Sequence, residues 1–495
     1  MKKTILLIIA TFMCLAIWKD SAFSTVTFSR FTISDNVKKP HGDWAGDVEN
    51  NNPKWEYDAF ATIVDDYQAV WYSNLGKGMT WGAKNVIYTG DRWCLEIVAG
   101  DLDKDGWIDA VSSFVQSAAT AISFLAVHKN NGNGTFTTTV LPTHTTRFRQ
   151  IKLEDINNDT WLDIVVSGSA PSASLILESG LYWYKNNGSM SFTENFIGTC
   201  NGWKVDCFDD EGDKHLEIAV TEEFFGANGT SPARLLVYKN NGAEGFAQIV
   251  VDNLGLHMGD PPGGGGVRCA DFDGDSRKDL LAGASNDGKL YWYKNNGGAS
   301  FTKYTVDASA SKVDGIDVGD FEPDGDMDIV ACGRDYWIRW YENDGFGNFT
   351  SHSIDVQYIL FDLPYVTYLD GDSCPDIIVT EATATTGHVF AYLNPCSGVG
   401  TEENKIKTTG NWLKMPSIVT KNSINITFGI ENKSRVKLEV LDITGRVIDV
   451  INDANYDKGS YKTLWNTNEK PNGTYFLSLK AENCPIVTKR ITLIR

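Results

Sequence analysis

One pattern recurs along most of the chain: an acidic loop that ends in an acidic residue and leads directly into an apolar segment. A well-formed copy reads DLDKDGWIDAV, with the form Asp-x-Asp-x-Asp-Gly-x-x-Asp before the apolar residues. The acidic residues that end the copies are Asp58, Asp109, Asp163, Glu217, Asp279, Asp328 and Asp376. They are separated by 51, 54, 54, 62, 49 and 48 residues. Self-similarity at such a period indicates an array in which each unit is one supersecondary element.

Two further landmarks give each unit about four strands. An aromatic strand closed by a turn follows the apolar segment, as in LYWYKNNG, and its Asn-Gly ending supplies the positive φ of a tight hairpin. A strand of the form Phe-x-x-x-x-Val/Ile comes next, beginning near Trp81 in the first unit. This last strand is missing after the seventh turn, whereas FSRFTIS, from Phe28, has its form and precedes the first unit. A circular array closes in this way, with one sheet built from both chain ends.

The predicted fold is therefore all-β: a seven-bladed β-propeller followed by a small C-terminal β-sandwich of the immunoglobulin-like kind. After Cys396 the repeat stops, and segments such as VKLEVLDITGRVIDV and GTYFLSLKAE alternate apolar and polar residues. Short alternating segments separated by turns are typical of a sandwich. We expect a signal peptide at 1–24, the propeller at 25–397, a linker at 398–412 and the sandwich at 413–495.

The N-terminus has the pattern of an export signal. Lys2 and Lys3 precede an apolar run from Thr4 to Trp18, and small residues near Ser24 suit cleavage. The alternative is a membrane anchor, for which the run is short. No later apolar stretch is long enough to cross a bilayer, so we expect no transmembrane span after cleavage and a protein that is secreted or on the outer cell surface.

Nine cysteines are present, and Cys14 lies within the expected signal peptide. An even number in an exported protein allows disulfides, and the pairs closest in sequence are Cys200–Cys207 and Cys374–Cys396. Buried free thiols are the alternative, because a free cysteine packs as a small apolar residue. The spacing does not decide between these alternatives.

The net charge of −20 bears on the kind of partner. A strongly acidic protein repels nucleic acids and anionic membranes. We therefore expect no nucleic-acid partner, and an acidic surface suits cations or neutral molecules better.

The acidic loops place carboxylates where a hard cation needs them. In the best copy, Asp101, Asp103, Asp105 and Asp109 stand at every second position and then four residues later. Calcium takes six to eight oxygen ligands, which a tight loop of alternating carboxylates can supply. The alternative is a set of hydrogen-bonded Asp turns without metal, because Asp and Asn are good turn formers.

The loops resemble the FG-GAP or VCBS type of propeller repeat over about residues 28–396. The resemblance implies a structural Ca²⁺ held by the first, third, fifth and ninth positions of each loop. The matching positions are Asp101, Asp103, Asp105, Asp109, Asp155, Asn157, Asp159, Asp163, Asp271, Asp273, Asp275, Asp279, Asp320, Glu322, Asp324 and Asp328. The other copies depart from the pattern. One has Glu211 and Glu217, one has Tyr368 at its first position, and the copy before Asp58 has lost its acidic ligands.

The C-terminal segment resembles the sorting domain of type IX secretion substrates. The resemblance rests on LEVLDITGRVI, KGSYKTLWN and PNGTYFLSLK, followed by a basic final strand. It implies that the type IX machinery carries the protein through the outer membrane. The alternative is an immunoglobulin-like accessory domain with no role in export.

The loops that enter the first strand of each unit carry a different chemistry, which combines aromatic and basic residues. We expect them to gather around the central channel and to bind a glycan or an extracellular protein, because Trp stacks on sugars and Arg forks to carboxylate or sulfate. The candidate residues are Trp44, Arg92, Trp93, Arg147, Arg149, Trp203, Lys204, His257 and Arg268. The alternative places the Trp side chains between blades and pairs the Arg side chains with nearby Asp.

A secreted polysaccharide lyase acting on a uronate-containing polymer is the alternative function. A lyase needs a base beside a cation that neutralises the uronate carboxylate. His144 or His257, with Arg147, Arg149 or Arg268, offers these groups. The chain has no G-x-S-x-G and no H-E-x-x-H motif, so we do not assign catalytic residues.

Overall fold

The computed structural model describes most of the chain between Val26 and Leu493. The described ranges are 26–50, 56–116, 122–170, 179–222, 233–254, 265–284, 288–333, 335–356, 360–382, 387–395, 412–414, 418–419, 423–430, 432–442, 446–467, 470–471, 473–481 and 487–493. The elements of these ranges are all β-strands. No helix in this part of the chain is long and apolar enough to pass through a membrane.

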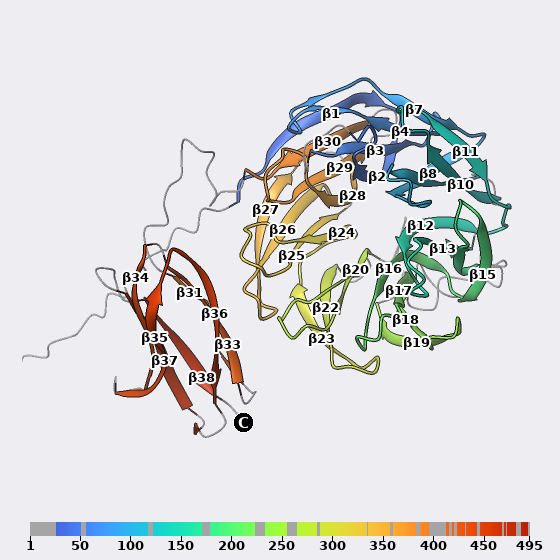
Figure 1. The fold of residues 1–495 in the computed structure, drawn as a ribbon. Coiled ribbons are helices and arrows are strands. Elements are labelled where there is room, and N and C mark those ends of the chain that lie inside the picture. Colours follow the sequence, from blue (N-terminus) through green and yellow to red (C-terminus); the bar gives the residue numbers. More distant parts are fainter. Residues whose placement is uncertain are drawn as a thin grey trace, which may run out of the picture.

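The strands before Asn394 form seven four-stranded antiparallel sheets, as the repeat predicts (Figure 1). Blade 1 contains β2 (Pro40–Gly46), β3 (Asp58–Ile63), β4 (Gln68–Tyr72) and β7 (Asn85–Thr89). Blade 2 contains β8 (Trp93–Gly100), β9 (Asp109–Val115), β10 (Ser123–Asn130) and β11 (Phe136–Val140). Blade 3 contains β12 (Arg147–Glu154), β13 (Asp163–Ser169), β14 (Gly180–Asn186) and β15 (Phe192–Thr199).

The remaining blades repeat this order. Blade 4 contains β16 (Gly202–Phe208), β17 (Glu217–Glu222), β18 (Arg234–Asn240) and β19 (Phe246–Asn253). Blade 5 contains β20 (Val267–Ala270), β21 (Asp279–Ala284), β22 (Lys289–Asn295) and β23 (Phe301–Asp307). Blade 6 contains β24 (Val313–Gly319), β25 (Asp328–Gly333), β26 (Trp337–Asn343) and β27 (Phe349–Val356). Blade 7 contains β28 (Leu360–Thr367), β29 (Asp376–Ala382), β30 (Gly387–Leu393) and β1 (Ser29–Val37).

The two ends of the propeller sequence meet in blade 7. Strand β1 pairs antiparallel with β30, from Ser29 opposite Leu393 to Val37 opposite Gly387. The first strand of each blade contacts the first strands of the neighbouring blades all the way round, including β2 with β28. The ring is therefore closed, as the displaced N-terminal strand predicts.

Blade 1 differs from the prediction at its outer edge. Trp81 lies in a small extra hairpin, β5 (Asn74–Gly76) with β6 (Thr80–Trp81), rather than in the outer strand. Strand β7 completes the sheet by pairing with β4. The hairpin is stabilised locally, because Trp81 Nε1 donates to the Gly78 carbonyl at 2.8 Å.

The burial pattern explains why the middle strands are so apolar. Every residue of β9 and β25 is buried, because both faces of these strands pack against neighbouring blades. The outer strand β11 is only partly buried and is rich in Thr. Apolar contacts between adjacent sheets thus form the core, as in the cluster that joins Val98 and Val111 of blade 2 to Ile164 of blade 3.

A repeated asparagine links each blade to the blade before it. This Asn stands at or just after the end of the third strand and is buried, and its side-chain amide donates to the loop of the preceding blade. The bonds to carbonyl oxygens are Asn130–Val48 (2.8 Å), Asn186–Leu102 (2.9 Å), Asn240–Ile156 (3.2 Å), Asn343–Phe272 (2.9 Å), Asn394–Phe321 (2.7 Å) and Asn74–Leu369 (2.7 Å). Asn295 donates instead to Asp210 Oδ1 at 2.7 Å. Asn74 links blade 1 to blade 7, so the closing seam has the same bond as the others.

The structure decides between the two alternatives for one pair of cysteines. Cys200 and Cys207 are both free thiols. Seven residues of mostly extended chain separate them by far more than the roughly 7 Å that a disulfide allows between Cα atoms. Cys374 is disulfide-bonded, and Cys396, its expected partner, lies outside the described residues.

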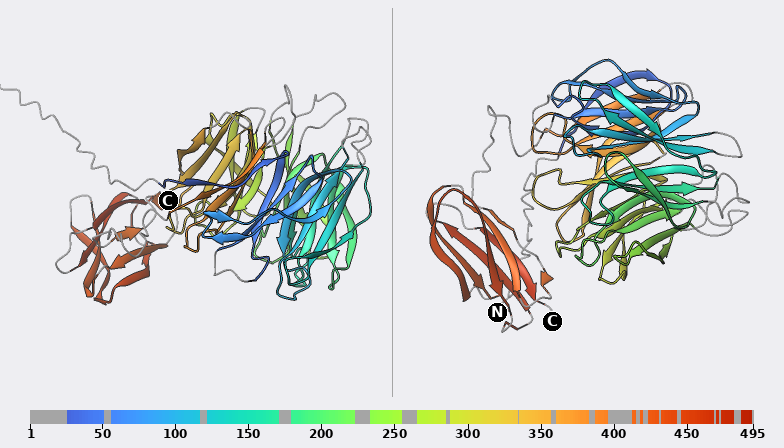
Figure 2. Two further views of the ribbon diagram at one scale, coloured as in Figure 1. Left: turned by 90° about the horizontal axis from the view of Figure 1, so that it is seen from above. Right: turned by 45° about the vertical axis from the view of Figure 1, so that its right-hand side comes forward.

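The C-terminal strands form two sheets around a core of their own (Figure 2). One sheet contains β31 (Trp412–Lys414), β33 (Ser423–Ile430) and β36 (Gly459–Asn466). The other contains β32 (Ile418–Val419), β38 (Val487–Leu493), β37 (Gly473–Ala481), β34 (Ser434–Leu441) and β35 (Val447–Tyr456). Phe428 and Trp465 of the first sheet and Leu438 of the second are buried in this core, as a sandwich requires.

Candidate calcium loops and channel face

The acidic loops share one end of the propeller. Each joins the first strand of a blade to the second, so all of them follow the carboxyl ends of the innermost strands. The loops that enter the innermost strands lie at the other end. The sequence prediction of two chemically different faces therefore has a geometric basis.

Each well-formed loop is held by its own first aspartate. In blade 2, Asp101 accepts the backbone N–H groups of Asp105 (3.2 Å) and Gly106 (3.0 Å). Gly106 has φ = 88°, a conformation that glycine adopts without strain. The loops beginning at Asp155, Asp271 and Asp320 use the same bonds. Gly106, or the residue at the same position of the other loops, thus turns the chain so that the acidic side chains of the loop face inward.

The aspartate at the ninth position has a second role that the sequence analysis missed. Asp109 is fully buried, and its two carboxylate oxygens accept the N–H groups of Leu102 (3.0 Å) and Asn130 (2.8 Å). Burial raises the pKa of Asp109 to about 6. Asp58 makes the same two bonds, to Val48 N and Asn74 N, in the copy that has lost the other acidic ligands. The ninth position therefore holds the turn even where no ion is expected.

Two loops bring three carboxylates close enough to share a cation. Ligand atoms of Asp101, Asp103 and Asp109 lie within 4.8 Å of one another, and so do those of Asp271, Asp273 and Asp275. In both loops the Oδ1 atom of the third position, Asp103 or Asp273, is buried, and no described residue donates a hydrogen bond to it. A buried carboxylate oxygen without a donor is costly, so these loops fit a divalent cation.

The other two strong loops arrange their ligands differently. At the third position of the blade 3 loop, the amide of Asn157 donates to Asp159 Oδ2 at 2.9 Å. In the blade 6 loop, burial and the neighbouring Asp328 raise the pKa of Glu322 well above its ordinary value. The described residues of these two loops, with Asp155, Asp163, Asp320 and Asp324, form no group of three close acidic ligands like those of blades 2 and 5.

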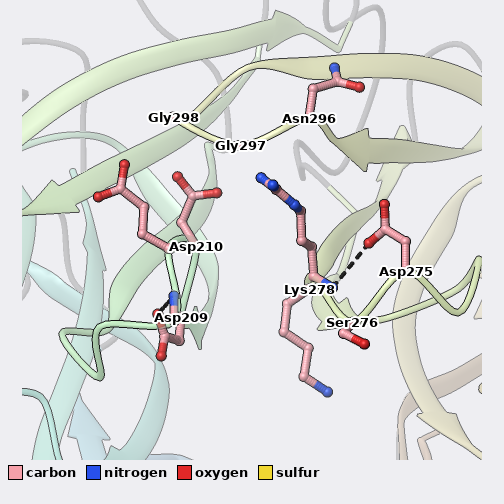
Figure 3. A pocket seen from close by; sticks show the side chains of 11 residues that line it. Asp209, Asp210, Asp275, Ser276, Lys278, Asn296, Gly297 and Gly298 are labelled. Atoms are coloured by element: carbon pink, nitrogen blue, oxygen red, sulfur yellow. Dashed lines mark hydrogen bonds between the residues drawn. The ribbon is translucent and has the colours of Figure 1, made fainter. Parts of the chain in front are cut away.

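A pocket of about 650 Å³ opens between the acidic loops of blades 4 and 5. Figure 3 shows Asp209 and Asp210 on one side and Asp275 with Lys278 on the other. Because Asp275 lines this pocket, solvent and ions can reach the blade 5 loop.

At the opposite end, three predicted residues form a compact cluster. The guanidinium carbon of Arg149 lies 4.3 Å from the ring centroid of Trp203, and Lys204 Nζ lies 5.9 Å from the same ring. Arg149 Nε donates to Ser169 Oγ at 2.7 Å. Trp203 Nε1 is buried and has no hydrogen-bond acceptor in the part of the chain that the structure describes. These residues stand near the start of the inner strands of blades 3 and 4.

Arg92, Trp93 and Arg147 also stand at the start of inner strands. Arg92 is paired with Asp91 at 2.7 Å and covers Phe124, whereas Trp93 is 37% exposed. Arg147 has no ion pair among the described residues. His257 lies outside the described residues.

Trp44 and Arg268 belong to the inner strands β2 and β20. Trp44 stacks on Tyr365, with ring centroids 4.4 Å apart. Arg268 is only 7% exposed, and its Nε lies 2.6 Å from Asp317 Oδ1. This ion pair holds Arg268 as the alternative interpretation proposed.

A layer of charged side chains on the inner strands was not predicted from the sequence. Lys152 pairs with Asp206 at 2.9 Å, beside the Arg268–Asp317 pair, and the four residues come from successive blades 3 to 6. In its own blade, each of these four residues lies opposite the third residue of the second strand. Tyr365 has the same position in blade 7. In the sequence, each of these residues stands 11 positions before the acidic residue that ends the loop of its blade, and this constant spacing is the signal that could have revealed the layer.

His144 belongs to a seam between blades. Its Nε2 lies 3.0 Å from the hydroxyl of Tyr184 and 2.9 Å from Glu194 Oε2. Three later seams have an equivalent bond from a tyrosine hydroxyl to an aspartate. These pairs are Tyr293–Asp252 (2.7 Å), Tyr341–Asp307 (3.0 Å) and Tyr392–Asp355 (3.0 Å). The hydrogen bonds of His144 are thus of the same kind as the structural bonds at these later seams.

Solved structures with a comparable chain path include three proteins of low sequence identity. Luciferin-regenerating enzyme has a TM-score of 0.37 at 9% identity, covering 74% of this chain and 95% of that one. Saccharomyces cerevisiae Sqt1 has 0.41 at 12%, covering 81% and 95%. A putative oxidoreductase (glucose dehydrogenase) from Thermus thermophilus has 0.39 at 11%, covering 74% and 100%. Because these TM-scores are below 0.5, no argument rests on them. No curated protein matches the chain.

Family models match two segments. The FG-GAP-like repeat matches residues 271–331, from the acidic loop of blade 5 into β25. The secretion system C-terminal sorting domain matches residues 420–493, which contain most of the C-terminal sandwich. The chain thus combines FG-GAP-like repeats with a type IX secretion sorting domain, and it is a secreted or outer-surface protein.

Proposed function

We propose that this protein is a calcium-stabilised propeller that binds an extracellular glycan or protein at the channel face. The buried oxygens of Asp103 and Asp273, which accept no hydrogen bond, carry the calcium assignment. Asp101 and Asp109, and Asp271 and Asp275, would complete the two sites, with the remaining loop ligands contributing according to the resemblance. The ion would neutralise packed carboxylates and stiffen the turns.

Metal removal tests the calcium assignment. We expect EDTA to lower the melting temperature of the full chain, and added calcium to restore it in the millimolar range typical of extracellular modules. The double variant Asp103→Asn, Asp273→Asn should lose most of the calcium response. An identical melting temperature in EDTA and in calcium would contradict the assignment.

The channel face suits an anionic sugar. Arg149 lies over the Trp203 ring, the largely buried Lys204 lies near the same ring, and Arg147 begins the same inner strand as Arg149, on a protein whose net charge is −20. Trp stacks on sugar rings and Arg forks to carboxylate or sulfate. We therefore infer that acidic glycans are the ligands most compatible with this end of the channel.

A glycan array followed by titration calorimetry tests this inference. We expect Trp203→Ala to weaken binding of an acidic glycan about tenfold or more. Trp161→Ala is the matched control, because Trp161 also lies under a lysine, Lys104 at 4.1 Å, but on the acidic-loop face. Equal losses in both variants would contradict a site at Trp203.

The lyase alternative has no supporting geometry at His144, which is engaged with Tyr184 and Glu194. We expect no unsaturated product, followed in the ultraviolet, when the protein is incubated with uronate-containing polysaccharides. Formation of such a product would favour the lyase over a binding protein.

A further inference from the structure

Four blades place a lysine at the same point, one residue before the asparagine that links the blades. These residues are Lys129, Lys185, Lys239 and Lys294. In blade 2, Lys129 Nζ contacts Asp103 and lies 2.7 Å from Asp105 Oδ2. In blade 5, Lys294 Nζ contacts Asp273 and lies 2.9 Å from Asp275 Oδ2. Each ammonium thus bridges the third and fifth positions of its own acidic loop.

The charge of the third position decides where the lysine goes. Lys239 reaches Glu211, the third position of the blade 4 loop, at 2.6 Å. Lys185 faces a loop whose third residue is the neutral Asn157, and its ammonium pairs instead with Glu244 in the next blade, at 2.5 Å. An ammonium therefore stands in the loop only where a third-position carboxylate attracts it.

The two bridging lysines occupy the loops that fit a cation best. Asp103 and Asp273 each use one oxygen for the lysine, while the other oxygen is buried and accepts no hydrogen bond. A divalent ion bound to the same carboxylates would repel the ammonium, because both cations are held within a few ångströms. The lysine side chains are 38% and 26% exposed, so they can swing into solvent.

We propose that Lys129 and Lys294 are built-in counter-cations, which hold their acidic loops in the calcium-free protein and compete with calcium for the same carboxylates. The proposal rests on the proposed calcium function and assigns its regulation. It predicts two opposite effects of removing the ammonium groups: a less stable calcium-free protein and a tighter calcium complex.

The test compares the full-length chain with the double variant Lys129→Met, Lys294→Met, because methionine keeps an unbranched apolar stem. Melting temperature is measured in EDTA, and calcium affinity is measured by titration calorimetry on chelator-treated protein. We expect the variant to melt a few degrees lower in EDTA and to bind calcium about tenfold more tightly. Lys185→Met is the matched control, and we expect neither quantity to change.

The outcomes separate the two proposals. If the wild type binds calcium and the double variant binds it no more tightly, the counter-cation proposal is wrong and the calcium assignment stands. If only the double variant binds calcium, the lysines have replaced the ion, which supports the counter-cation proposal and contradicts the calcium assignment. If neither binds calcium, both proposals fail.

Discussion

At the scale of single residues, Asp109 at the ninth position of the blade 2 loop combines two tasks. Its carboxylate faces the place where a cation fits, and it also accepts two backbone N–H groups that close the loop onto the next turn. Asp58 shows the second task alone. Buried carboxylates with two N–H donors contribute to stability through charge-assisted hydrogen bonds.

Asp58→Asn tests this structural task apart from calcium. An amide cannot accept at both atoms, so one buried N–H loses its acceptor, and we expect a loss of about 2–4 kcal/mol in the free energy of unfolding. The loss should be equal in EDTA and in calcium, measured by urea denaturation. Asp65→Asn, which removes a surface ion pair with Lys39, should cost less than about 1 kcal/mol.

His128 gives a prediction for pH. It is fully buried between Ser112 Oγ (2.7 Å) and Thr138 Oγ1 (2.8 Å), and burial lowers its pKa to about 3. The unfolded chain takes up a proton near pH 6.5 and the folded chain does not. Stability is therefore unaffected above pH 6.5 and falls as the pH drops below it.

The variant His128→Gln isolates this effect from the carboxylates, which titrate in both proteins. Between pH 8 and pH 5, the free energy of unfolding of the wild type should fall by about 2 kcal/mol more than that of the variant. Urea denaturation at both pH values measures the change. If the stabilities of the two proteins differ by the same amount at pH 5 and at pH 8, folded His128 is protonated at pH 5 as it is in the unfolded chain.

At the scale of elements, the N-terminal strand β1 removes the open edge that blade 7 would otherwise have. Its side chains alternate: Ile33 is buried in the cluster shared by blades 7 and 1, whereas Thr32 is exposed. Strand β1 also links blade 7 to blade 6, because Arg30 lies 3.0 Å from Asp355 of blade 6. Closure thus depends on packing along β1 as well as on its backbone pairing.

Ile33→Ala tests this closure. We expect a loss of about 2–4 kcal/mol, because the truncated side chain leaves a cavity in a buried cluster. Thr32→Ala, on the exposed side of the same strand, should change stability by less than about 1 kcal/mol. Similar small effects in both variants, measured by thermal or chemical unfolding, would contradict a packed closing strand.

At the scale of the whole molecule, the chain separates its tasks between two ends of the ring and a sorting domain. Acidic loops occupy one end and aromatic and basic residues the other, and between them charged pairs join the inner strands of blades 3 and 4 and of blades 5 and 6. The sorting domain directs the chain to the outside. A rigid ring suits this arrangement because every blade is linked to both neighbours.

Removal of residues 413–495 tests the sorting domain. We expect the truncated chain to stop in the periplasm, because the type IX machinery no longer recognises it, and the full chain to reach the surface or medium. Fractionation followed by immunoblotting measures the distribution. Arrival of the truncated chain outside the cell at the normal level would contradict a role of the tail in export.

Local patterns were sufficient for much of this fold. The seven units, the displaced strand that closes the ring and the glycine turns all follow from short-range periodicity and turn chemistry, which a sequence shows directly. The convergence of Asp101, Asp103 and Asp109 could also be anticipated, since these residues share one loop. Contacts between blades were different, because they join residues about 50 or more positions apart. The burial of Arg268 against Asp317 and the bond from Asn74 to Leu369 depend on how neighbouring sheets pack, and no local pattern specifies that packing. The lysines reach acidic loops of their own blades, which depends on how the strands of a single sheet bring residues 21 to 26 positions apart together.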